Sequence, residues 1–191
     1  MAIVVVGGSA KDIGKTALAC GVIAALPDFD WTAVKITGHD YGIDSISEGP
    51  IVRSETAAGQ ATDTARYLAA GAHRALLVTR RGPEVPIDDI RLELGEDCNV
   101  LFESNRLIDV VKPDVCLALV GGSGMELKPS FLRLLQKADA LVSLGAIDME
   151  LAERAANIPR FELQALDRLT PELVKWLRAR LDPSRRQDLK A

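Results

Sequence analysis

The residues of this chain whose types and spacing could do chemistry lie near its N-terminus, in the segment Gly8-Ser9-Ala10-Lys11-Asp12-Ile13-Gly14-Lys15-Thr16. Glycines let backbone N–H groups approach an anion closely, and the start of a helix offers N–H groups that have no partner within the helix. A lysine adds a mobile positive charge, and a threonine hydroxyl can bind Mg²⁺. The apolar run Ile3–Val6 precedes the segment, and an Ala- and Leu-rich run at 17–26 follows it. This order predicts a strand, a loop that holds the phosphates of a nucleoside triphosphate, and a helix.

The spacing within this loop differs from the usual G-x-x-x-x-G-K-[ST] pattern. Ser9 stands where the first glycine belongs, and the nearest glycine is Gly8. We therefore expect a loop one residue longer than usual, with Gly8 as its first glycine. An ordinary connection between a strand and a helix is the alternative interpretation. The predicted nucleotide-binding residues are Gly8, Lys11, Asp12, Ile13, Gly14, Lys15, Thr16 and Ala17.

Carboxylates farther along the chain could complete a magnesium site with Thr16. Glu103 follows the apolar run Val100–Phe102, and Asp63 begins a segment of helical composition. Mg²⁺ in nucleotide sites is commonly held by one or two carboxylates together with the phosphates. We therefore predict Thr16, Asp63 and Glu103 as metal ligands. A solvated strand end is the alternative for Glu103, and a helix cap is the alternative for Asp63.

Lys15, Lys35 and Asp12 are the predicted catalytic residues. Lys35 lies within an otherwise apolar strand, where an unpaired ammonium is costly, so it could reach an anion from the strand end. It could equally extend into solvent from an edge strand. Asp12 could contact a hydroxyl or an amine of a substrate, or it could serve only to repel anions from the bulk solution. His39-Asp40, directly after the same strand, could contact metal, nucleotide or substrate.

The elements that must position these residues alternate between strands and helices. Because the strands are nearly continuous apolar runs, they predict an α/β fold with three layers, in which helices cover both faces of a mostly parallel sheet. Ligands of such sheets collect beyond the carboxyl ends of the strands. The stretch 43–62 has no clear period and is expected to be a long loop. The predicted strands are 3–6, 31–37, 75–79, 98–105, 114–120, 140–144 and 160–163, and the predicted helices are 17–26, 63–70, 86–94, 107–111, 129–135, 148–156 and 171–181.

Length and composition limit the function classes. The 191 residues predict a single domain over 1–181 with a polar C-terminal tail at 182–191. The net charge is −4, and the Lys and Arg residues are mostly scattered, which argues against nucleic-acid binding. Cys20, Cys98 and Cys116 are far apart and are expected to be buried thiols in a reducing compartment. No apolar run approaches the ~20 residues of a membrane span, so we expect a soluble, cytoplasmic protein without membrane contact.

Two families resemble parts of this chain. The order of Gly-Lys-Thr, then 33–40, then 63–72 with its Ala-Gly-Ala ending, looks like the molybdopterin-guanine dinucleotide biosynthesis adapter family, MobB. This resemblance covers roughly the first half of the chain, and it implies a P-loop NTPase fold and a role beside a cofactor-biosynthesis protein. Ile36 and Gly38 stand where that family has histidines.

The loop itself is more similar to that of dethiobiotin synthetase, which reads Gly-Thr-Asp-Thr-Glu-Val-Gly-Lys-Thr and shares the longer spacing. By position, the resemblance implies that Lys35 binds near the phosphates and that Thr16, Asp63 and Glu103 gather Mg²⁺. Asp12 stands where that family has a loop glutamate. The Glu-Gly-Ala-Gly-Gly segment of that family is replaced here by Glu103-Ser104-Asn105.

These observations predict a Mg²⁺-dependent protein that binds ATP or GTP, a slow NTPase related to the molybdenum-cofactor adapters. The alternative is an ATP-dependent ligase or kinase of the dethiobiotin synthetase type that acts on a small acid or amine. A nucleotide-gated binding module without turnover is a third interpretation. The sequence does not indicate whether the nucleotide base is adenine or guanine, because no Asn-Lys-x-Asp guanine motif is present. Proteins of this class often dimerise across the ligand face, so a homodimer is compatible with the sequence.

Overall fold

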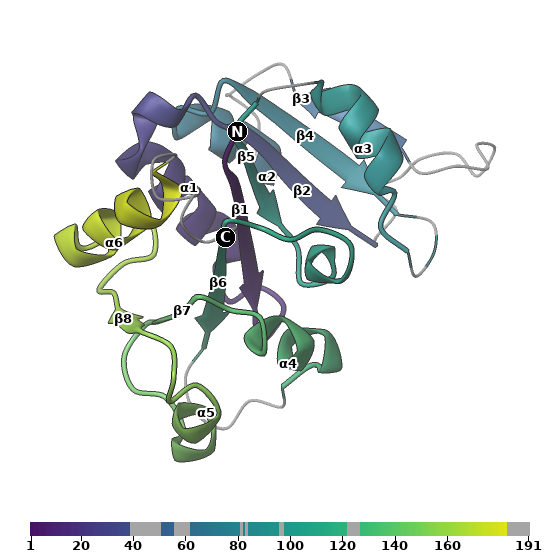
Figure 1. Cartoon of the computed structure of the whole chain (residues 1–191). Coiled ribbons are helices and arrows are strands. Elements are labelled where there is room, and N and C mark those ends of the chain that lie inside the picture. The colour runs from purple at the N-terminus through teal and green to yellow at the C-terminus, as the bar shows by residue number, and fades with distance from the viewer. Residues whose placement is uncertain are drawn as a thin grey trace, which may run out of the picture.

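The chain folds around one eight-stranded sheet, with the strands in the order β3-β4-β2-β5-β1-β6-β7-β8 (Figure 1). The structure is a computed structural model that describes residues 1–38, 51–55, 62–80, 82, 84–95, 98–121 and 127–182. The strands are β1 Ile3–Gly8, β2 Thr32–Thr37, β3 Ile51–Glu55, β4 Arg74–Thr79, β5 Val100–Glu103, β6 Val115–Val120, β7 Ala140–Ser143 and β8 Arg160–Glu162. The helices are α1 Lys15–Ala25, α2 Asp63–Ala69, α3 Ile87–Leu94, α4 Pro129–Leu135, α5 Met149–Arg154 and α6 Pro171–Leu181, with single 3₁₀ turns at Pro27–Phe29 and Leu107–Asp109.

The sheet is parallel except at one edge, where β3 pairs with β4 in the antiparallel sense. The N-terminal strand β1 lies in the middle, between β5 and β6. Glu103, the last residue of β5, lies opposite Val6 of β1 on one side and Lys35 of β2 on the other. The register therefore brings the ends of three strands to one edge of the sheet, where ligands of parallel sheets bind.

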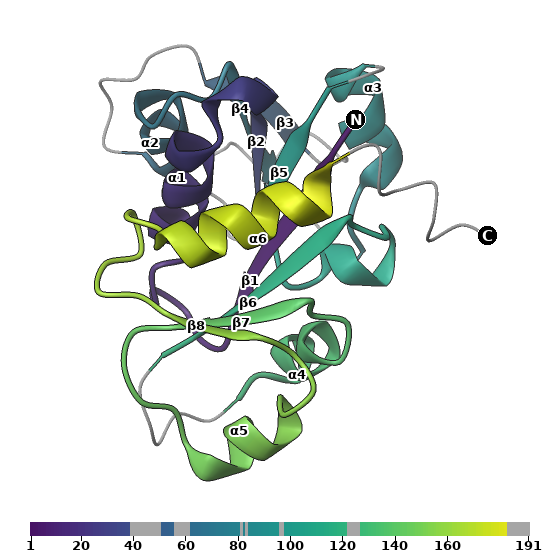
Figure 2. The same cartoon turned by 60° about the vertical axis from the view of Figure 1, so that its left-hand side comes forward.

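Helices cover both faces of the sheet, so the core has two halves. On one face α1, α2 and α6 pack through side chains such as Leu18, Tyr67 and Leu177. On the other face α3, α4 and α5 pack through Ile90, Phe131 and Leu151. Figure 2 shows α1, α2 and α6 together in front of the sheet. The predicted three-layer α/β architecture is confirmed.

The expectation of an uninterrupted loop over 43–62 is wrong at residues 51–55, which form β3. The strand is held by its pairing with β4, in which Val52 lies opposite Val78, and this partner is distant in the sequence. The segment has charged and polar residues at three of its five positions, so its local pattern did not indicate a strand. His39-Asp40 and the remainder of the predicted loop, other than Thr62, lie outside the described residues.

Three smaller expectations can be compared with the structure. The helix predicted at 107–111 is only a 3₁₀ turn at Leu107–Asp109. None of the three thiols is in a disulfide. Only Cys116 is buried, and burial raises its pKa to about 12, whereas Cys20 and Cys98 are partly exposed. In the ranges that the structure describes, no helix combines the length and the apolar character needed to cross a membrane.

Candidate functional site

The loop that begins the site is anchored where β1 ends. The side-chain amide of Asn105 pairs with Gly8 as a neighbouring strand would: its Oδ1 accepts from the Gly8 N–H at 2.7 Å, and its Nδ2 donates to the Gly8 carbonyl at 2.9 Å. Ser9 is buried and continues the pairing with β6, because its N–H donates to the Leu119 carbonyl at 2.9 Å. Its hydroxyl accepts from the Gly121 N–H at 3.2 Å. Gly8 and Ser9 thus belong to the strand pairing, and the free part of the loop starts after them.

Beyond Ser9 the loop turns back sharply and enters α1 at Lys15. Gly14 has φ 101°, a left-handed conformation in which any other residue would be strained, and Asp12 also has a positive φ of 58°. The Lys15 ammonium donates to the Ala10 carbonyl at 3.0 Å, so this side chain lies along the loop. Burial lowers the pKa of Lys15, although the charge of Glu103 opposes that shift. The loop therefore places a lysine where partial desolvation strengthens its attraction to an anion.

Three oxygen-bearing side chains from separate elements converge on the ammonium of Lys35. Its Nζ lies 3.2 Å from Oε1 of Glu103 and 3.4 Å from Oγ1 of Thr16, and it also donates to Oδ2 of Asp63. Thr16 comes from α1, Asp63 from the first turn of α2, and Glu103 from the end of β5. Burial alone would lower the pKa of Lys35, but the two carboxylates outweigh it and raise the pKa. The three predicted metal ligands thus surround one cation.

Glu103 is held by two further donors, one of which the sequence reasoning missed. Its Oε2 accepts from the Thr16 hydroxyl at 2.7 Å and from the hydroxyl of Tyr67 on α2. Tyr67 is fully buried, and burial together with the charge of Glu103 raises its pKa well above its usual value. Glu103 itself is only 5% exposed. A buried carboxylate with a donor on each oxygen is fixed in place and remains able to attract a cation.

The donor set fits Mg²⁺, which prefers oxygen ligands and usually keeps water and phosphate oxygens in its shell. Thr16, Asp63 and Glu103 offer hydroxyl and carboxylate oxygens around a point where a cation, the Lys35 ammonium, is already accommodated. Among the described residues, no group of three or more His, Cys, Asp and Glu side chains could hold a metal ion by itself. A metal here would therefore need further oxygens, from a bound ligand or from water, to complete its shell.

These residues line one open cleft of about 700 Å³ at the carboxyl edge of the sheet. Most of the predicted site residues line it, including Lys11 and Asp12, which are exposed. Ile13 and Ala17 do not, because their side chains pack against the core, so only their backbone N–H groups are available to a ligand. The lining includes Gly8, Lys15, Thr16, Lys35, Asp63, Arg66, Arg80, Glu103, Asn105, Arg106 and Lys128.

Ser9, Tyr67 and Asn105 take part in the site although sequence reasoning gave them no role. Ser9 occupies the position of the absent first glycine, and that departure from the usual pattern was the signal for it. Asn105 follows Glu103 by two residues, in the segment that departs from the synthetase pattern. Tyr67 gave no signal, because an aromatic residue in a short amphipathic helix is ordinarily a core residue.

Comparison with known proteins gives structural matches only. No protein-family model matches the chain, and no curated protein matches it by sequence. The structure of LpxK from Aquifex aeolicus in complex with ATP is similar to 85% of this chain, with 19% identity and a TM-score of 0.50; the chain spans about half (53%) of LpxK. A MobB homologue from Bacillus stearothermophilus covers 95% of the chain and is itself covered over 98%, with 20% identity and a TM-score of 0.48. Bacillus subtilis MobB has 16% identity and a TM-score of 0.46, with 96% of this chain and 99% of MobB covered. The similarity to LpxK and the observed topology show that the chain has the three-layer α/β fold of P-loop NTPases.

Proposed function

We propose that this protein binds a Mg²⁺–nucleoside triphosphate in the cleft and hydrolyses it slowly. The observation that carries the proposal is the convergence of Thr16, Asp63 and Glu103 on the Lys35 ammonium, next to a loop that ends in Gly14 and Lys15. A buried cluster of this kind is costly to form, and the fold alone does not require it. Charged groups with perturbed pKa values in a cleft are typical of functional sites.

Each side chain has a role that follows from its position. The backbone N–H groups of 13–17 and the ammonium of Lys15 would hold the outer phosphates, since they combine the start of α1 with a mobile charge. Thr16, Asp63 and Glu103 would hold Mg²⁺ through their oxygens, which would neutralise charge on the phosphates. Lys35, which lies among the same oxygens, would pair with phosphate oxygens as their negative charge rises.

Asp12 has a different environment from these groups. It is exposed at the bend of the loop and lines the cleft. We propose that it contacts a hydroxyl or an amine of the bound ligand. Its position at the mouth of the cleft supports this role more than one in binding metal.

The relation to molybdenum-cofactor adapters is a part of this proposal that rests on the sequence. It is supported by the resemblance of 33–40 and 63–72 to that family, which includes Lys35 and Asp63 of the cluster. The expected partner is then a cofactor-biosynthesis protein in the cytoplasm. Retention of such an enzyme by the immobilised protein, with and without Mg²⁺–GTP, would test it.

An ATP-dependent ligase or kinase is the second candidate, favoured by the size of the cleft. Its volume of about 700 Å³ extends past the loop to Arg80 and Lys128, which leaves room beside a nucleotide. Turnover without any second substrate separates the two candidates. A hydrolase releases phosphate alone, whereas a ligase or kinase needs its acceptor.

The binding step is tested by calorimetric titration with non-hydrolysable ATP and GTP analogues, each with and without Mg²⁺. We expect Mg²⁺-dependent binding that Lys15→Ala weakens by about 100-fold, because a charge-assisted contact to the outer phosphates is lost. Lys175→Ala is the matched control, since Lys175 is an exposed lysine on α6 outside the cleft. Equal affinity of the Lys15→Ala variant and the parent would show that the loop is an ordinary connection.

A further inference from the structure

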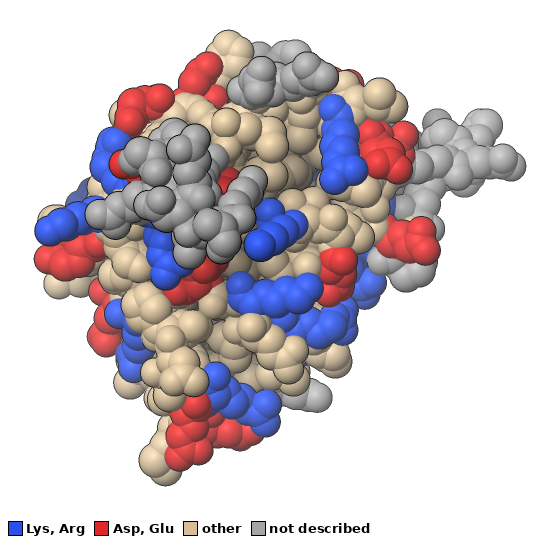
Figure 3. All heavy atoms as spheres, viewed as in Figure 1, with Lys and Arg blue, Asp and Glu red and all other residues tan. Residues whose placement is uncertain are grey.

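The cleft is basic, although the chain as a whole is acidic. Its lining contains seven Lys and Arg residues against three Asp and Glu residues, whereas the whole chain has 23 against 27. Figure 3 shows Lys and Arg side chains gathered near the middle of this face, over the ends of the central strands. Clefts lined by charge of one sign attract ligands of the opposite sign. The question is whether one bound nucleotide would use all of this charge.

Part of the positive charge already belongs to the phosphate end of the cleft. Lys15 lies along the loop, and Lys35 is held by two carboxylates. Arg66 is 3.6 Å from Asp63 on the same helix. These residues surround the predicted phosphate and metal positions. Lys11 lies in the phosphate loop itself. The three other basic residues that line the cleft are Arg80, Arg106 and Lys128, which follow β4, β5 and β6.

Arg80 is held in place across the end of β2. Its backbone N–H donates to the Thr37 carbonyl at 2.8 Å, and its guanidinium donates to the Gly82 carbonyl. A Cβ at position 38 would lie 3.0 Å from its Nη2, so Gly38 makes room for this side chain. Arg80 is half-buried, and no described carboxylate forms an ion pair with it or with Lys128.

The two arginines of this group also lie close enough to repel one another. Burial lowers the pKa of Arg80, and the charge of Arg106 lowers it further. Arg80 is the half-buried member of the group, whereas Arg106 and Lys128 are exposed. A second cation beside a half-buried guanidinium is unfavourable unless an anion shares the space. Guanidinium groups hold carboxylates and phosphates through paired N–H donors, and a neighbouring lysine adds charge.

We propose that Arg80, Arg106 and Lys128 form a second anion site, which binds a small molecule bearing a phosphate or carboxylate group beside the nucleotide. This proposal rests on the proposed function, since the nucleotide would occupy the part of the cleft that the phosphate loop lines. Ser130 and Asn105 line the same space and offer neutral donors and acceptors. The protein would then hold a nucleotide and an anionic second ligand at once.

The test uses the full chain in which Lys15→Ala has disabled the phosphate loop. Inorganic phosphate and succinate are titrated separately by calorimetry at constant ionic strength. We expect at least one of them to bind at a single site. Adding Arg80→Gln should weaken that binding at least tenfold, and adding Lys128→Gln should weaken it about threefold. Adding Arg91→Gln, an exposed arginine on α3 outside the cleft, should leave it unchanged.

The two anions distinguish the sources of the ligand: preference for phosphate indicates a phosphorylated molecule, and preference for succinate a carboxylic acid. Absence of binding by both, or equal binding with Arg80→Gln, would overturn the proposal. Arg80→Lys, which keeps the charge, serves if the glutamine variant does not fold, and it should lose affinity severalfold because the paired donors are gone.

A second titration separates this proposal from the proposed function. The parent protein is saturated with a Mg²⁺–nucleotide analogue and then titrated with the same anion. Binding to the loaded protein supports two sites, and displacement of one ligand by the other overturns them. If no analogue binds, the proposed function fails, whereas the Lys15→Ala titrations still decide whether the anion site exists.

Discussion

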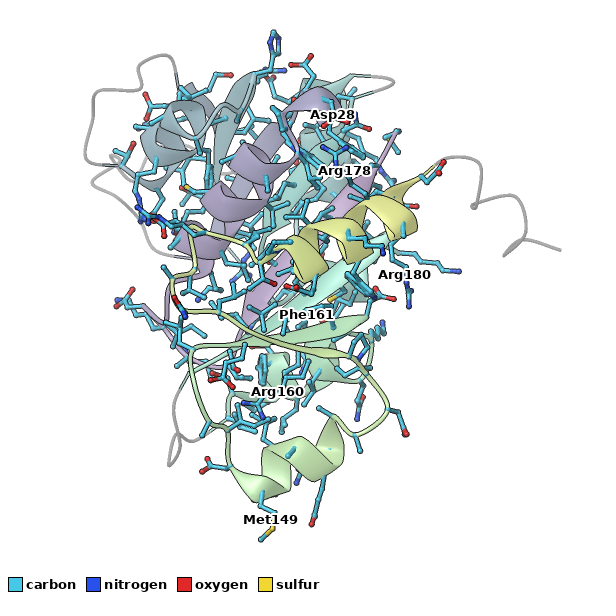
Figure 4. The ribbon with its side chains drawn as sticks, turned by 90° about the vertical axis from the view of Figure 1, so that its left-hand side faces the viewer. Asp28, Met149, Arg160, Phe161, Arg178 and Arg180 are labelled. Atoms are coloured by element: carbon cyan, nitrogen blue, oxygen red, sulfur yellow. The ribbon has the colours of Figure 1, made fainter. Side chains whose placement is uncertain are left out.

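The ion pairs at the carboxyl edge of the sheet and those on α6 differ in burial and in the number of partners. In the cleft, Lys35 is 16% and Glu103 is 5% exposed, and each contacts several groups from different elements. On α6, Arg178 holds Asp28 through two N–H donors at 2.8 and 2.7 Å, and both side chains are about half exposed (Figure 4).

The ion pairs of α6 join this helix to other parts of the fold. Arg178 joins the last helix to the 3₁₀ turn after α1, and Arg180 lies 5.1 Å from the centre of the Trp176 ring and 3.2 Å from Asp139. Water and salt screen such contacts, so each contributes modestly to stability. They need nothing beyond the protein itself.

The cleft cluster has the opposite character. Burying its charges costs free energy, which the mutual attraction and hydrogen bonds offset only while every partner is present. Apolar side chains would pack the same space more cheaply. The comparison therefore teaches that burial of charge, rather than the number of ion pairs, points to a ligand.

The largest effect is expected from Glu103→Gln, which changes the buried cluster in the cleft. The variant loses one charge of the cluster and one acceptor, so we expect Mg²⁺-dependent turnover to fall by about 100-fold, with analogue affinity changed only severalfold. Steady-state hydrolysis against Mg²⁺ concentration measures it. Glu162→Gln is the control, because Glu162 also ends a strand but is 59% exposed and forms an ion pair with the neighbouring Arg160. Equal turnover at limiting Mg²⁺ would remove Glu103 from the site.

The next largest effect is expected from Tyr67→Phe, because the Tyr67 hydroxyl donates to Glu103 and helps to hold it in place. Loss of its hydroxyl leaves a buried carboxylate oxygen with one donor fewer, which should cost about 1–3 kcal/mol of unfolding free energy in urea. The Mg²⁺ concentration for half-maximal turnover should also rise severalfold, since Glu103 is held less firmly.

A destabilised control separates these two effects. Phe131→Leu loosens the core on the opposite face and touches none of the cluster. It should lower stability by about 1 kcal/mol with the Mg²⁺ requirement unchanged. An unchanged requirement in Tyr67→Phe as well would make Tyr67 a core residue only.

The polar positions at this edge were partly predictable from sequence. Glu103 and Lys35 stood out because a charge in or directly after an apolar strand is unusual, and parallel topology brings strand ends together. Tyr67 and Asn105 were not predictable, since their roles depend on a hydroxyl and an amide that reach another element. The bonds of Asn105 to Gly8 span 97 residues of sequence.

The strands of the sheet were likewise predictable only in part. The strands next to β1 are apolar except for Glu103 at the end of β5, and they were located within a few residues, because burial on both faces leaves a strong local pattern. Strand β3 was missed because its pairing with β4 supplies what its own residues do not. Local composition thus predicted the buried layers, and long-range pairing determined the edge.

A smaller effect is expected from the pH dependence of Asp63. Burial alone would raise its pKa, but the hydrogen bond and charge of Lys35 lower it below 3.8. A lowered carboxyl pKa adds stability that is present above 3.8 and is lost as the pH falls through the folded-state value. The difference in unfolding free energy between the parent and Asp63→Asn should be about 1 kcal/mol near neutral pH and should shrink below about pH 4.

A matched variant sharpens this measurement. Asp88→Asn removes an acid from the first turn of α3 that also pairs with an arginine three residues on, Arg91, at 3.5 Å, but Asp88 is 90% exposed. Its effect should be a few tenths of a kcal/mol at most. A difference for Asp63→Asn that persists unchanged at pH 3 would contradict the ion pair with Lys35.

The smallest effect is expected at α6. Arg178→Gln removes both bonds to Asp28, and unfolding in urea should show a loss of at most about 1 kcal/mol, since both partners are half exposed. The loss should shrink further in 1 M salt, where screening reaches within a few ångströms. Nucleotide-analogue affinity should not change, because the pair lies outside the cleft. A loss of unfolding free energy that is insensitive to salt and as large as that of Tyr67→Phe would mean that exposed and buried charges stabilise this fold equally. The distinction between ion pairs that stabilise the fold and those that form a ligand site would then fail.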